Sequence, residues 1–381
     1  MAFLRNRAVN WLYLHSSIRN LAEGMGNAFV LVFLLRAGVS VPASLCAIAL
    51  IVATRFTVRP AVLVAARRFG LRALVIAGTA GMALQYPVLA DVHGTDAALL
   101  AYCLVAALGG TFYWTSYHAY FSLLGDAEHR GHQIGANVAL GALVGIAAPL
   151  AGAWALLELG ARAAFGAVAA IQVLAAIPLL ATPDVGISPS APGALRAALP
   201  GVGLFMADGW LEASYTLVWQ IALFLSLGES LSAYGGAMAL AALVGAVGGL
   251  WLGRHIDAGH GRRGVEIAFS VLTLTLVLRA LSVGTPWLAV AANAVGALTV
   301  CLLGPAQMVP VYNLAKASPC ALRFHVAAEG GWDVGCASGC LVAAFLVSHG
   351  APLGSVMLLA FVGVAGQVFL LRRTYVRMEA W

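Results

Sequence analysis

Long apolar stretches alternate along the chain with short charged or Pro/Gly-rich breaks. A helix that crosses a bilayer needs about 20 mostly apolar residues. The stretches predict six spans in the first half, near residues 10–36, 41–65, 71–90, 97–123, 131–156 and 161–181. Six more are predicted in the second half, near 200–227, 231–253, 264–283, 286–313, 323–348 and 352–371. The pattern therefore predicts an all-α integral membrane protein with twelve transmembrane helices.

A proline-rich segment, TPDVGISPSAPGALRAALP (182–200), separates the two halves. It has no long apolar run, and proline interrupts helices because its nitrogen carries no hydrogen. We therefore predict three parts, an N-terminal six-helix bundle at 1–182, a linker at 183–199 and a C-terminal six-helix bundle at 200–381.

A weak internal repeat relates the two halves. When the first predicted span is aligned with the seventh, Glu23 matches Glu212. A Tyr-His pair at 117–118 is followed by an Arg-x-His sequence, and a Tyr-Asn pair at 312–313 is followed by another. Six-helix repeats are a common plan of secondary transporters, whose substrate site lies between the halves near the membrane midplane. The repeat predicts two pseudo-symmetric bundles with a site between them.

The composition agrees with a chain surrounded by lipid. Of the 381 residues 62% are apolar and 9% are charged, whereas soluble proteins carry about 25% charged residues. Of the 21 Lys and Arg residues, two lie in loops opposite the termini and four within spans, which leaves fifteen on the side of the termini. Cytoplasmic loops are enriched in basic residues, so we place the protein in the bacterial inner (cytoplasmic) membrane with both termini cytoplasmic. This explains the net charge of +6 without any nucleic acid.

Motifs of enzymes and of ATP-driven pumps are missing from the sequence. It has no GxxxxGK[ST] phosphate-binding loop, no HExxH and no GxSxG. The six cysteines form no CxxC pair, so neither a zinc ribbon nor a disulfide scaffold is predicted. We expect no enzymatic activity, no cofactor and no metal site of this kind. We expect the protein to be a monomer whose partners are a small-molecule substrate, protons and the lipid bilayer.

The segment GRHIDAGHGRR (253–263), between the eighth and ninth predicted spans, resembles the loop signature of the major facilitator superfamily (MFS). The glycine, aspartate and basic pair of that signature are matched by Gly253, Asp257, Arg262 and Arg263. The resemblance implies that this loop latches helix ends together on the cytoplasmic side. The corresponding first-half segment, LVAARRFGLR (63–72), has Arg67 in place of the aspartate.

The same resemblance implies an MFS-like architecture. Its two bundles face each other across a central cavity, which the first, fourth, seventh and tenth spans line. The segment GALVGIAAPLAGA (141–153) of the fifth span is similar to the small-residue and proline pattern of the superfamily's exporters. Close packing of small residues between helices explains the same segment without any role in export, and both interpretations stay open.

Charged residues inside the spans are candidates for function, because a charge at the bilayer centre costs about 2.5–3.5 kcal/mol on insertion scales. Arg19 and Glu23 lie one turn apart on the first span, as do Asp208 and Glu212 on the seventh. We expect Arg19 to pair with Asp208 when the cytoplasmic side is closed, and both glutamates to line the cavity. A permanent pair that neutralises Arg19 is the alternative. Arg279, near the outer end of the ninth span, is expected to extend to the interface.

His325, Glu329 and Asp333 lie on one face of the eleventh span, because they are four residues apart. Three interpretations stay open for them: a proton or cation pathway, a structural network with Arg55 or Arg59 of the second span, and a transition-metal site. The residues assigned to proton coupling and gating are Arg19, Glu23, Asp208, Glu212, Glu329 and Asp333.

The fourth span carries an aromatic sequence, TFYWTSYHAYF (111–121). Tyr113 and Tyr117 lie one turn apart, and Trp114 and His118 form an adjacent stripe. Such a face can stack on an amphipathic organic substrate, while helix packing is the alternative. The residues assigned to substrate binding are Asn27, Tyr113, Tyr117, His118, Gln133, Asn137, Tyr215, Trp219, Gln307 and Asn313.

These observations predict a secondary active transporter that works by alternating access. We expect it to be coupled to protons and to export a small amphipathic organic compound. The alternatives are proton-coupled uptake of a polar solute, lipid flipping, metal export, and a receptor or assembly factor that transports nothing.

Overall fold

The computed structural model describes the backbone of residues 6–126, 130–187, 190–256 and 261–379, together with the side chains of most of them. Within these ranges all regular structure is helical, and no strand is present. The first half contains α1 (Arg7–Met25), η2 (Asn27–Phe29), α2 (Val30–Arg36), α3 (Val41–Val58), α4 (Pro60–Ala90), α5 (Ala97–Leu124), α6 (Arg130–Glu158), α7 (Gly160–Leu174) and η3 (Ile177–Ala181). The second half contains α8 (Ala194–Glu212), η4 (Ala213–Val218), α9 (Trp219–Ser226), α10 (Leu231–Ile256), α11 (Gly261–Ser282), α12 (Pro286–Ala317), α13 (Ala321–Ser348), α14 (Leu353–Met357) and α15 (Ala360–Glu379).

Nine helical segments of the described chain are long and apolar enough to cross a membrane. The helical segments at three further predicted positions are α6, the continuous α8–η4–α9, and α11. In α6 and α11 the apolar stretches that qualify are shorter, at Leu143–Glu158 and Ile267–Ser282. The structure is therefore consistent with the predicted twelve spans.

Two predicted boundaries differ from the observed ones. The second span was expected to continue to residue 65, but α3 ends at Val58 and a new helix begins at Pro60. Gly70 then interrupts α4 with φ 77°, which glycine adopts without steric strain. Residues 60–69 are thus a short separate helix before the third span. The seventh span begins at Ala194, six residues before the predicted start at 200, after Gly193 with φ 79°.

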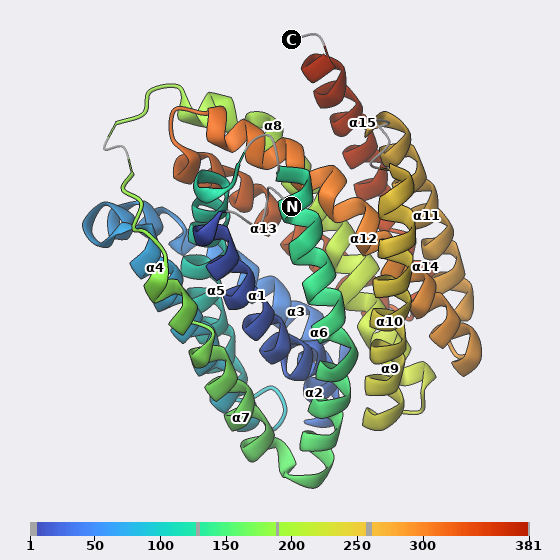
Figure 1. Ribbon diagram of the computed structural model, residues 1–381. Helices are drawn as coiled ribbons and strands as arrows, with labels where there is room; N and C mark the ends of the chain where they lie inside the picture. The colour runs from blue at the N-terminus through green and yellow to red at the C-terminus, as the bar shows by residue number, and fades with distance from the viewer. Residues whose placement is uncertain (1–5, 127–129, 188–189, 257–260, 380–381) are drawn as a thin grey trace.

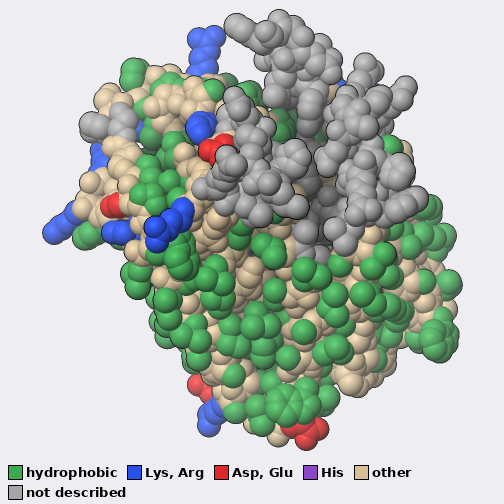
Figure 2. All heavy atoms as spheres, in the orientation of Figure 1, with side chains coloured by type: hydrophobic (Ala, Val, Ile, Leu, Met, Phe, Trp, Pro, Cys, Tyr) green, Lys and Arg blue, Asp and Glu red, His purple; other side chains and the backbone are tan. Residues whose placement is uncertain are grey.

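The surface has the character of a membrane protein. Figure 2 shows a broad band of apolar side chains across the face in view, while most of the visible Lys and Arg gather toward one end. Both chain termini lie toward this same end of the molecule in Figure 1. We call it the terminal end. The helices carry large apolar side chains outward, among them Leu281 and Trp287. Exposure of such an apolar band to water is unfavourable, so the band suits contact with lipid chains.

Helices pack in corresponding ways in the two halves. Helix α1 packs on α6, and α8 packs on α13. Both contacts use glycine to bring backbones together. A Cβ added to Gly152 would lie 2.8 Å from Cα of Met25, and one added to Gly209 would lie 2.8 Å from the backbone nitrogen of Cys336. In the fifth span the small-residue segment therefore serves close helix packing, one of the two interpretations that its sequence allows.

Two further helix pairs join the halves to each other. Helix α3 packs on α13, and α6 packs on α10. The first pair brings the second span against the eleventh, and the other brings the fifth against the eighth, so the two contacts correspond to one another under the internal repeat. Figure 1 shows the N-terminal helices, in blue and green, beside the C-terminal ones, in yellow and red. The candidate site lies between these two sets.

Candidate functional site

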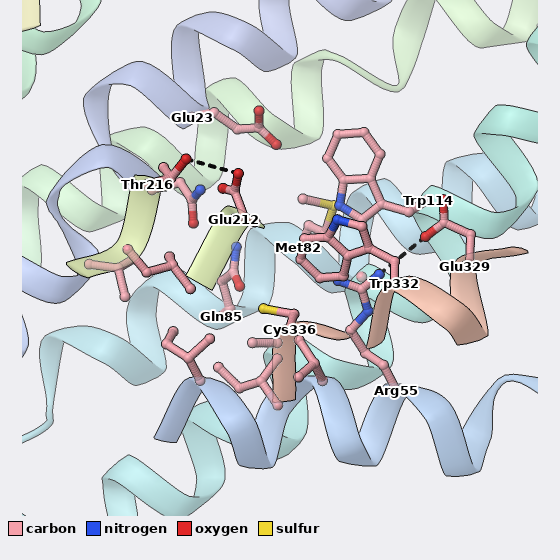
Figure 3. A pocket seen from close by; sticks show the side chains of 18 of the residues that line it. Glu23, Arg55, Met82, Gln85, Trp114, Glu212, Thr216, Glu329, Trp332 and Cys336 are labelled. Atoms are coloured by element: carbon pink, nitrogen blue, oxygen red, sulfur yellow. Dashed lines mark hydrogen bonds and ion pairs between the residues drawn. The ribbon is translucent and has the colours of Figure 1, made fainter. Parts of the chain in front are cut away.

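A cavity of about 450 Å³ lies between the two sets of helices. Its wall combines acidic, amide and aromatic side chains, and Figure 3 shows ten of the lining residues labelled. Four assigned gating residues and two assigned substrate residues line it, namely Glu23, Asp208, Glu212, Glu329, Asn27 and His118. Lining residues outside the two assigned sets include Arg55, Gln85, Trp114, Phe205, Thr216, Gln220 and Trp332.

Both the first and the seventh span depart from regular α-helix beside the cavity, and we call these two departures breaks although the chain stays helical through them. After Glu23, α1 ends at Met25 and three residues follow in 3₁₀ conformation, Asn27–Phe29. After Glu212, six residues are π-helical, Ala213–Val218. Glu23 and Glu212 are the residues that the internal repeat matches, so the two breaks occupy corresponding positions.

Side chains from other helices bind backbone carbonyls in these breaks. The hydroxyl of Tyr234 on α10 donates to the carbonyl of Ala28, at 3.0 Å. The guanidinium Nη1 of Arg279 on α11 donates to the carbonyl of Tyr215, at 2.7 Å. A backbone that departs from regular helix at membrane depth needs such partners, and paired interruptions in two halves are the pattern found at binding sites of secondary transporters.

Arg279 differs from its expected position. We expected it to extend toward the membrane interface, but its side chain is 6% exposed. It lies over the rings of Tyr215 and Trp219, with its Cζ atom 4.1 and 4.9 Å from their centroids. The physical reason is the carbonyl that it caps in the π-helical segment, which holds the charge inside the protein.

Arg19 and Asp208 do not pair in this structure. Arg19 forms an ion pair with Glu23 one turn along the same helix, and its Cζ atom lies 4.8 Å from the ring centroid of Trp114. Asp208 accepts hydrogen bonds from Gln367 Nε2 at 2.8 Å and Trp332 Nε1 at 3.2 Å. The local partner of Arg19 neutralises it without a contact between the two sets of helices.

Asp208 and Glu212 have no salt bridge within the part of the chain that is described. Glu212 accepts a hydrogen bond from Thr216 Oγ1 at 2.8 Å, inside the π-helical segment. Arg279 is near enough to act on the charge of Glu212 but forms no ion pair with it. Two carboxyl groups in one cavity are therefore held mainly by neutral donors.

A dense ionic cluster joins α3 to α13 on the terminal side of the cavity. Arg55 contacts Glu329 at 3.4 Å and Asp333 at 3.2 Å. Arg59, only 2% exposed, pairs with Asp333, lies 3.7 Å from Glu329 and donates to Thr115. We call these four charged residues the α3–α13 cluster. It matches the structural network that was one interpretation of the eleventh span.

His118 extends this contact between the halves. Its Nε2 lies 3.4 Å from Glu329 Oε1, and its Nδ1 lies 2.6 Å from the hydroxyl of Tyr312. The ring of His325 stacks on His118 with centroids 5.7 Å apart, rather than joining the two carboxylates. Arginines contact both Glu329 and Asp333. No group of three His, Cys, Asp or Glu residues that could hold a metal ion is found among the described residues.

Tyr113 and Tyr117 do not line the cavity. Tyr113 hydrogen bonds to His15 Nε2 at 2.9 Å, and the Tyr117 hydroxyl hydrogen bonds to Ser16 at 2.8 Å, so both face α1. The cavity face of α5 is instead the stripe that includes Trp114 and His118. Neighbouring stripes on a helix are separated by a small rotation, and the sequence does not say which stripe faces the partner helix.

The other residues assigned to substrate binding also lie away from the cavity wall. Most are engaged within one set of helices. Gln133 bonds to Asp126, Asn137 to Tyr117, Trp219 to Asn293, Tyr215 to the carbonyl of Gly296, and Gln307 to Asp208, while Asn313 is half-buried elsewhere. Gln307 thus supports a lining carboxylate indirectly.

Of the loop signature, Asp257 lies outside the described residues, and so do the surroundings of Gly253 and the side chains of Arg262 and Arg263. The corresponding first-half turn is described. There the linker residue Asp184 accepts a hydrogen bond from the backbone nitrogen of Arg72, at 3.2 Å. A linker carboxylate therefore contacts the turn whose own sequence lacks the aspartate.

A chain whose described regular structure is all helical, with an apolar outer band and a polar cavity between two related sets of helices, is a multi-pass membrane protein. Its fold is that of the major facilitator superfamily. It is similar to the crystal structure of the human organic anion transporter MFSD10 (TETRAN), with TM-score 0.67 and 17% identity over 96% of this chain and 99% of that chain. It is also similar to the MFS transporter FucP in the outward conformation, with TM-score 0.68 and 12% identity over 97% of this chain and 99% of that one. No protein-family model and no curated protein sequence matches the chain.

Proposed function

We propose that this protein is a secondary active transporter that exports a small amphipathic organic compound in exchange for protons. The observation that carries the proposal is the cavity between the two sets of helices, with Asp208 and Glu212 in its wall and no ion pair to either from the residues that the structure describes. The MFS fold supports a transporter rather than an enzyme. It works as a monomer in this proposal.

Contacts between the halves lie on both sides of the cavity, which supports alternating access. On the terminal side these contacts are the α3–α13 cluster and the His118–Tyr312 bond. On the opposite side the ring of Phe29 packs edge-on against Tyr234, at 5.5 Å, within an apolar cluster that contains residues of both halves. If the contacts on one side break while those on the other side stay formed, the cavity opens to one side of the membrane at a time.

Proton coupling follows from the state of the four lining carboxylates. Glu23 is paired with Arg19, and Glu329 with Arg55. Protonation of Asp208 or Glu212 gives up less electrostatic interaction energy, because neither is in an ion pair with an arginine that a proton would break. We assign the proton-carrying role to these two residues, the α3–α13 cluster to gating, and the terminal end to the cytoplasmic side of the bacterial inner membrane.

Proteoliposomes that contain the full chain and a pH-sensitive dye test this proposal. Amphipathic cations, anions and neutral compounds, together with sugars and peptides, are added and proton movement is recorded. We expect one compound class to drive protons in the opposite direction, and the flux to vanish in Asp208→Asn or Glu212→Gln. The matched control is Asp91→Asn, an exposed carboxylate that pairs with Arg162 at 3.0 Å far from the cavity.

A proton flux in the same direction as the compound would instead establish uptake, the second candidate. The amide side chains of Asn27, Gln85 and Gln220 in the cavity wall support that candidate, since they can hydrogen bond a polar solute. If no compound class moves protons through protein that is shown to be folded, the proton-coupled proposal is wrong. A facilitator, a lipid flippase or a protein without transport would then be the better description.

A further inference from the structure

We infer that the cavity binds an organic cation with an apolar or aromatic body, and that this cation and protons compete for Asp208 and Glu212. The inference rests on the proposed function, since it names the class of substrate for the same cavity. Its basis is the distribution of charge and of aromatic rings around the cavity wall.

The first step is the charge of the wall. Arg19 is matched by Glu23, and the two arginines of the α3–α13 cluster are matched by its two acids. These pairs leave Asp208 and Glu212 in excess. The remaining nearby cation, Arg279, does not line the cavity and donates to the carbonyl of Tyr215 behind it. When both carboxyls are ionised the wall is therefore negative.

The second step excludes an anion as the preferred ligand. Arg55 is the arginine in the cavity wall, and both acids of the α3–α13 cluster hold it. An anion would have to separate Arg55 from Glu329 or Asp333 and would also approach the two unpaired carboxylates. A cation meets neither cost, because an opposite charge close by stabilises an ionised carboxylate.

The third step concerns the aromatic residues. Trp114 and Trp332 both contribute to the wall, and Figure 3 shows their rings in the central part of the cavity between Glu212 and Glu329. Each ring already has a guanidinium near it, with Arg19 Cζ 4.8 Å from Trp114 and Arg55 Cζ 5.1 Å from Trp332. Indole rings attract cations through their π-faces, and each of these rings already has one beside it, so this part of the wall favours positive charge and offers apolar surface to the body of a ligand.

The fourth step links the cation to the proton. A carboxyl that holds a proton is neutral and loses its attraction for a cation, so binding of one expels the other. The cavity of about 450 Å³ is within the usual range of small-molecule sites, about 300–1,000 Å³. Exchange of one organic cation for bound protons therefore follows from a single set of side chains.

Two probes of nearly equal shape and opposite charge test the inference. Tetraphenylphosphonium is the cation and tetraphenylborate is the anion, and binding of each to the purified full chain in nanodiscs is measured by equilibrium dialysis against empty nanodiscs. We expect the cation to bind at least about tenfold more tightly, with release of protons to a weak buffer. We expect Asp208→Asn and Glu212→Gln each to weaken cation binding about tenfold or more, while Asp91→Asn leaves it unchanged.

Equal or tighter binding of tetraphenylborate would overturn the inference. Cation binding that the double variant Asp208→Asn/Glu212→Gln retains in full would also overturn it, with thermal unfolding used to show that the variant is folded. The outcome for transport is separate. If an anion or neutral compound drives protons in proteoliposomes, the proposed function stands and the cation inference fails. If the cation binds and releases protons but no compound is transported, the inference about the site stands and the transport proposal fails.

Discussion

Neutralising Asp333 is expected to open the terminal side of the cavity. Asp333 is 1% exposed and pairs with both arginines of the α3–α13 cluster. In Asp333→Asn the two arginines share Glu329 alone, while side-chain volume hardly changes. Removing one partner of a buried ion pair costs about 3–5 kcal/mol. Because Glu329 keeps part of the interaction, with 3.7 Å to Arg59, the lower end of that range applies.

This cost acts mainly on the closed state, since opening lets water reach the arginines. About 3 kcal/mol corresponds to a change of about a hundredfold in the ratio of open to closed protein. The native cysteines report the change. Cys336 is fully buried and lines the cavity, whereas Cys103 is buried in the core of the N-terminal helices with its thiol 3.6 Å from the carbonyl of Ala47. Alkylation by N-ethylmaleimide, followed by peptide mass spectrometry, gives both rates in one sample.

We expect Asp333→Asn to raise the alkylation rate of Cys336 at least about tenfold and to leave that of Cys103 unchanged. The double variant Arg59→Leu/Asp333→Leu is the matched control, because replacing both partners of a buried pair by apolar residues is often neutral. Its Cys336 rate should return toward the wild-type value. An unchanged Cys336 rate in folded Asp333→Asn would refute the assignment of the cluster as the closing contact. A parallel rise of both cysteines would show general loosening instead.

Three further outcomes follow from individual contacts. Tyr234→Phe removes a hydrogen bond of 3.0 Å between the halves on the opposite side, worth about 1 kcal/mol, so Cys336 should react about fivefold faster with a membrane-impermeant maleimide added from that side. Gly152→Ala places a Cβ 2.8 Å from the α1 backbone and should destabilise the protein by about 1–3 kcal/mol in thermal unfolding, whereas Gly166→Ala, with open space around it, should not. Asp96 caps the start of α5, and hydrogen bonds from the backbone nitrogens of its turn lower the pKa of its carboxyl. Its cap is therefore present at neutral pH and is lost as pH falls through the lowered pKa. The protection factor of the α5 N-terminal amides, which is the intrinsic exchange rate at each pH divided by the observed rate, should therefore fall at acid pH, and Asp96→Asn should abolish that dependence.

The existence of the helices could be predicted because apolar length is a local signal that does not depend on neighbours. The end of α3 also had a local cause, since Pro60 lacks a donor. The π-helical conformation of Ala213–Val218 had no local cause in the sequence. Its carbonyl at Tyr215 is capped by Arg279 from a helix more than 60 positions later in the chain, and such a long-range partner cannot be read from the segment itself.

In the candidate site, too, the residues that have a local signal in the sequence could be predicted, and the contacts between helices could not. The acids were assigned because burying a charge in the membrane is costly, which makes an intramembrane acid a candidate for function. Their partners depend on how helices pack, and Arg19 therefore pairs with Glu23 rather than with Asp208. Trp332 was missed although it directly precedes Asp333 on the eleventh span. An aromatic residue beside an intramembrane acid is a signal that sequence reading could have used.

The two sides of the cavity are closed by different physical forces, and this difference bears on the proposed transport cycle. Opening the terminal side exposes four charges to water, so hydration of the charges compensates for much of the lost attraction. Opening the opposite side exposes apolar residues such as Phe29 and Ile221, which water disfavours in proportion to area. Salt acts on exposed charges far more than on buried pairs, so it should stabilise the charges that opening of the terminal side exposes and favour that opening, while it should leave the apolar side closed. A cation that neutralises Asp208 and Glu212 acts between the two, where it removes the repulsion between neighbouring carboxylates without touching either closing contact.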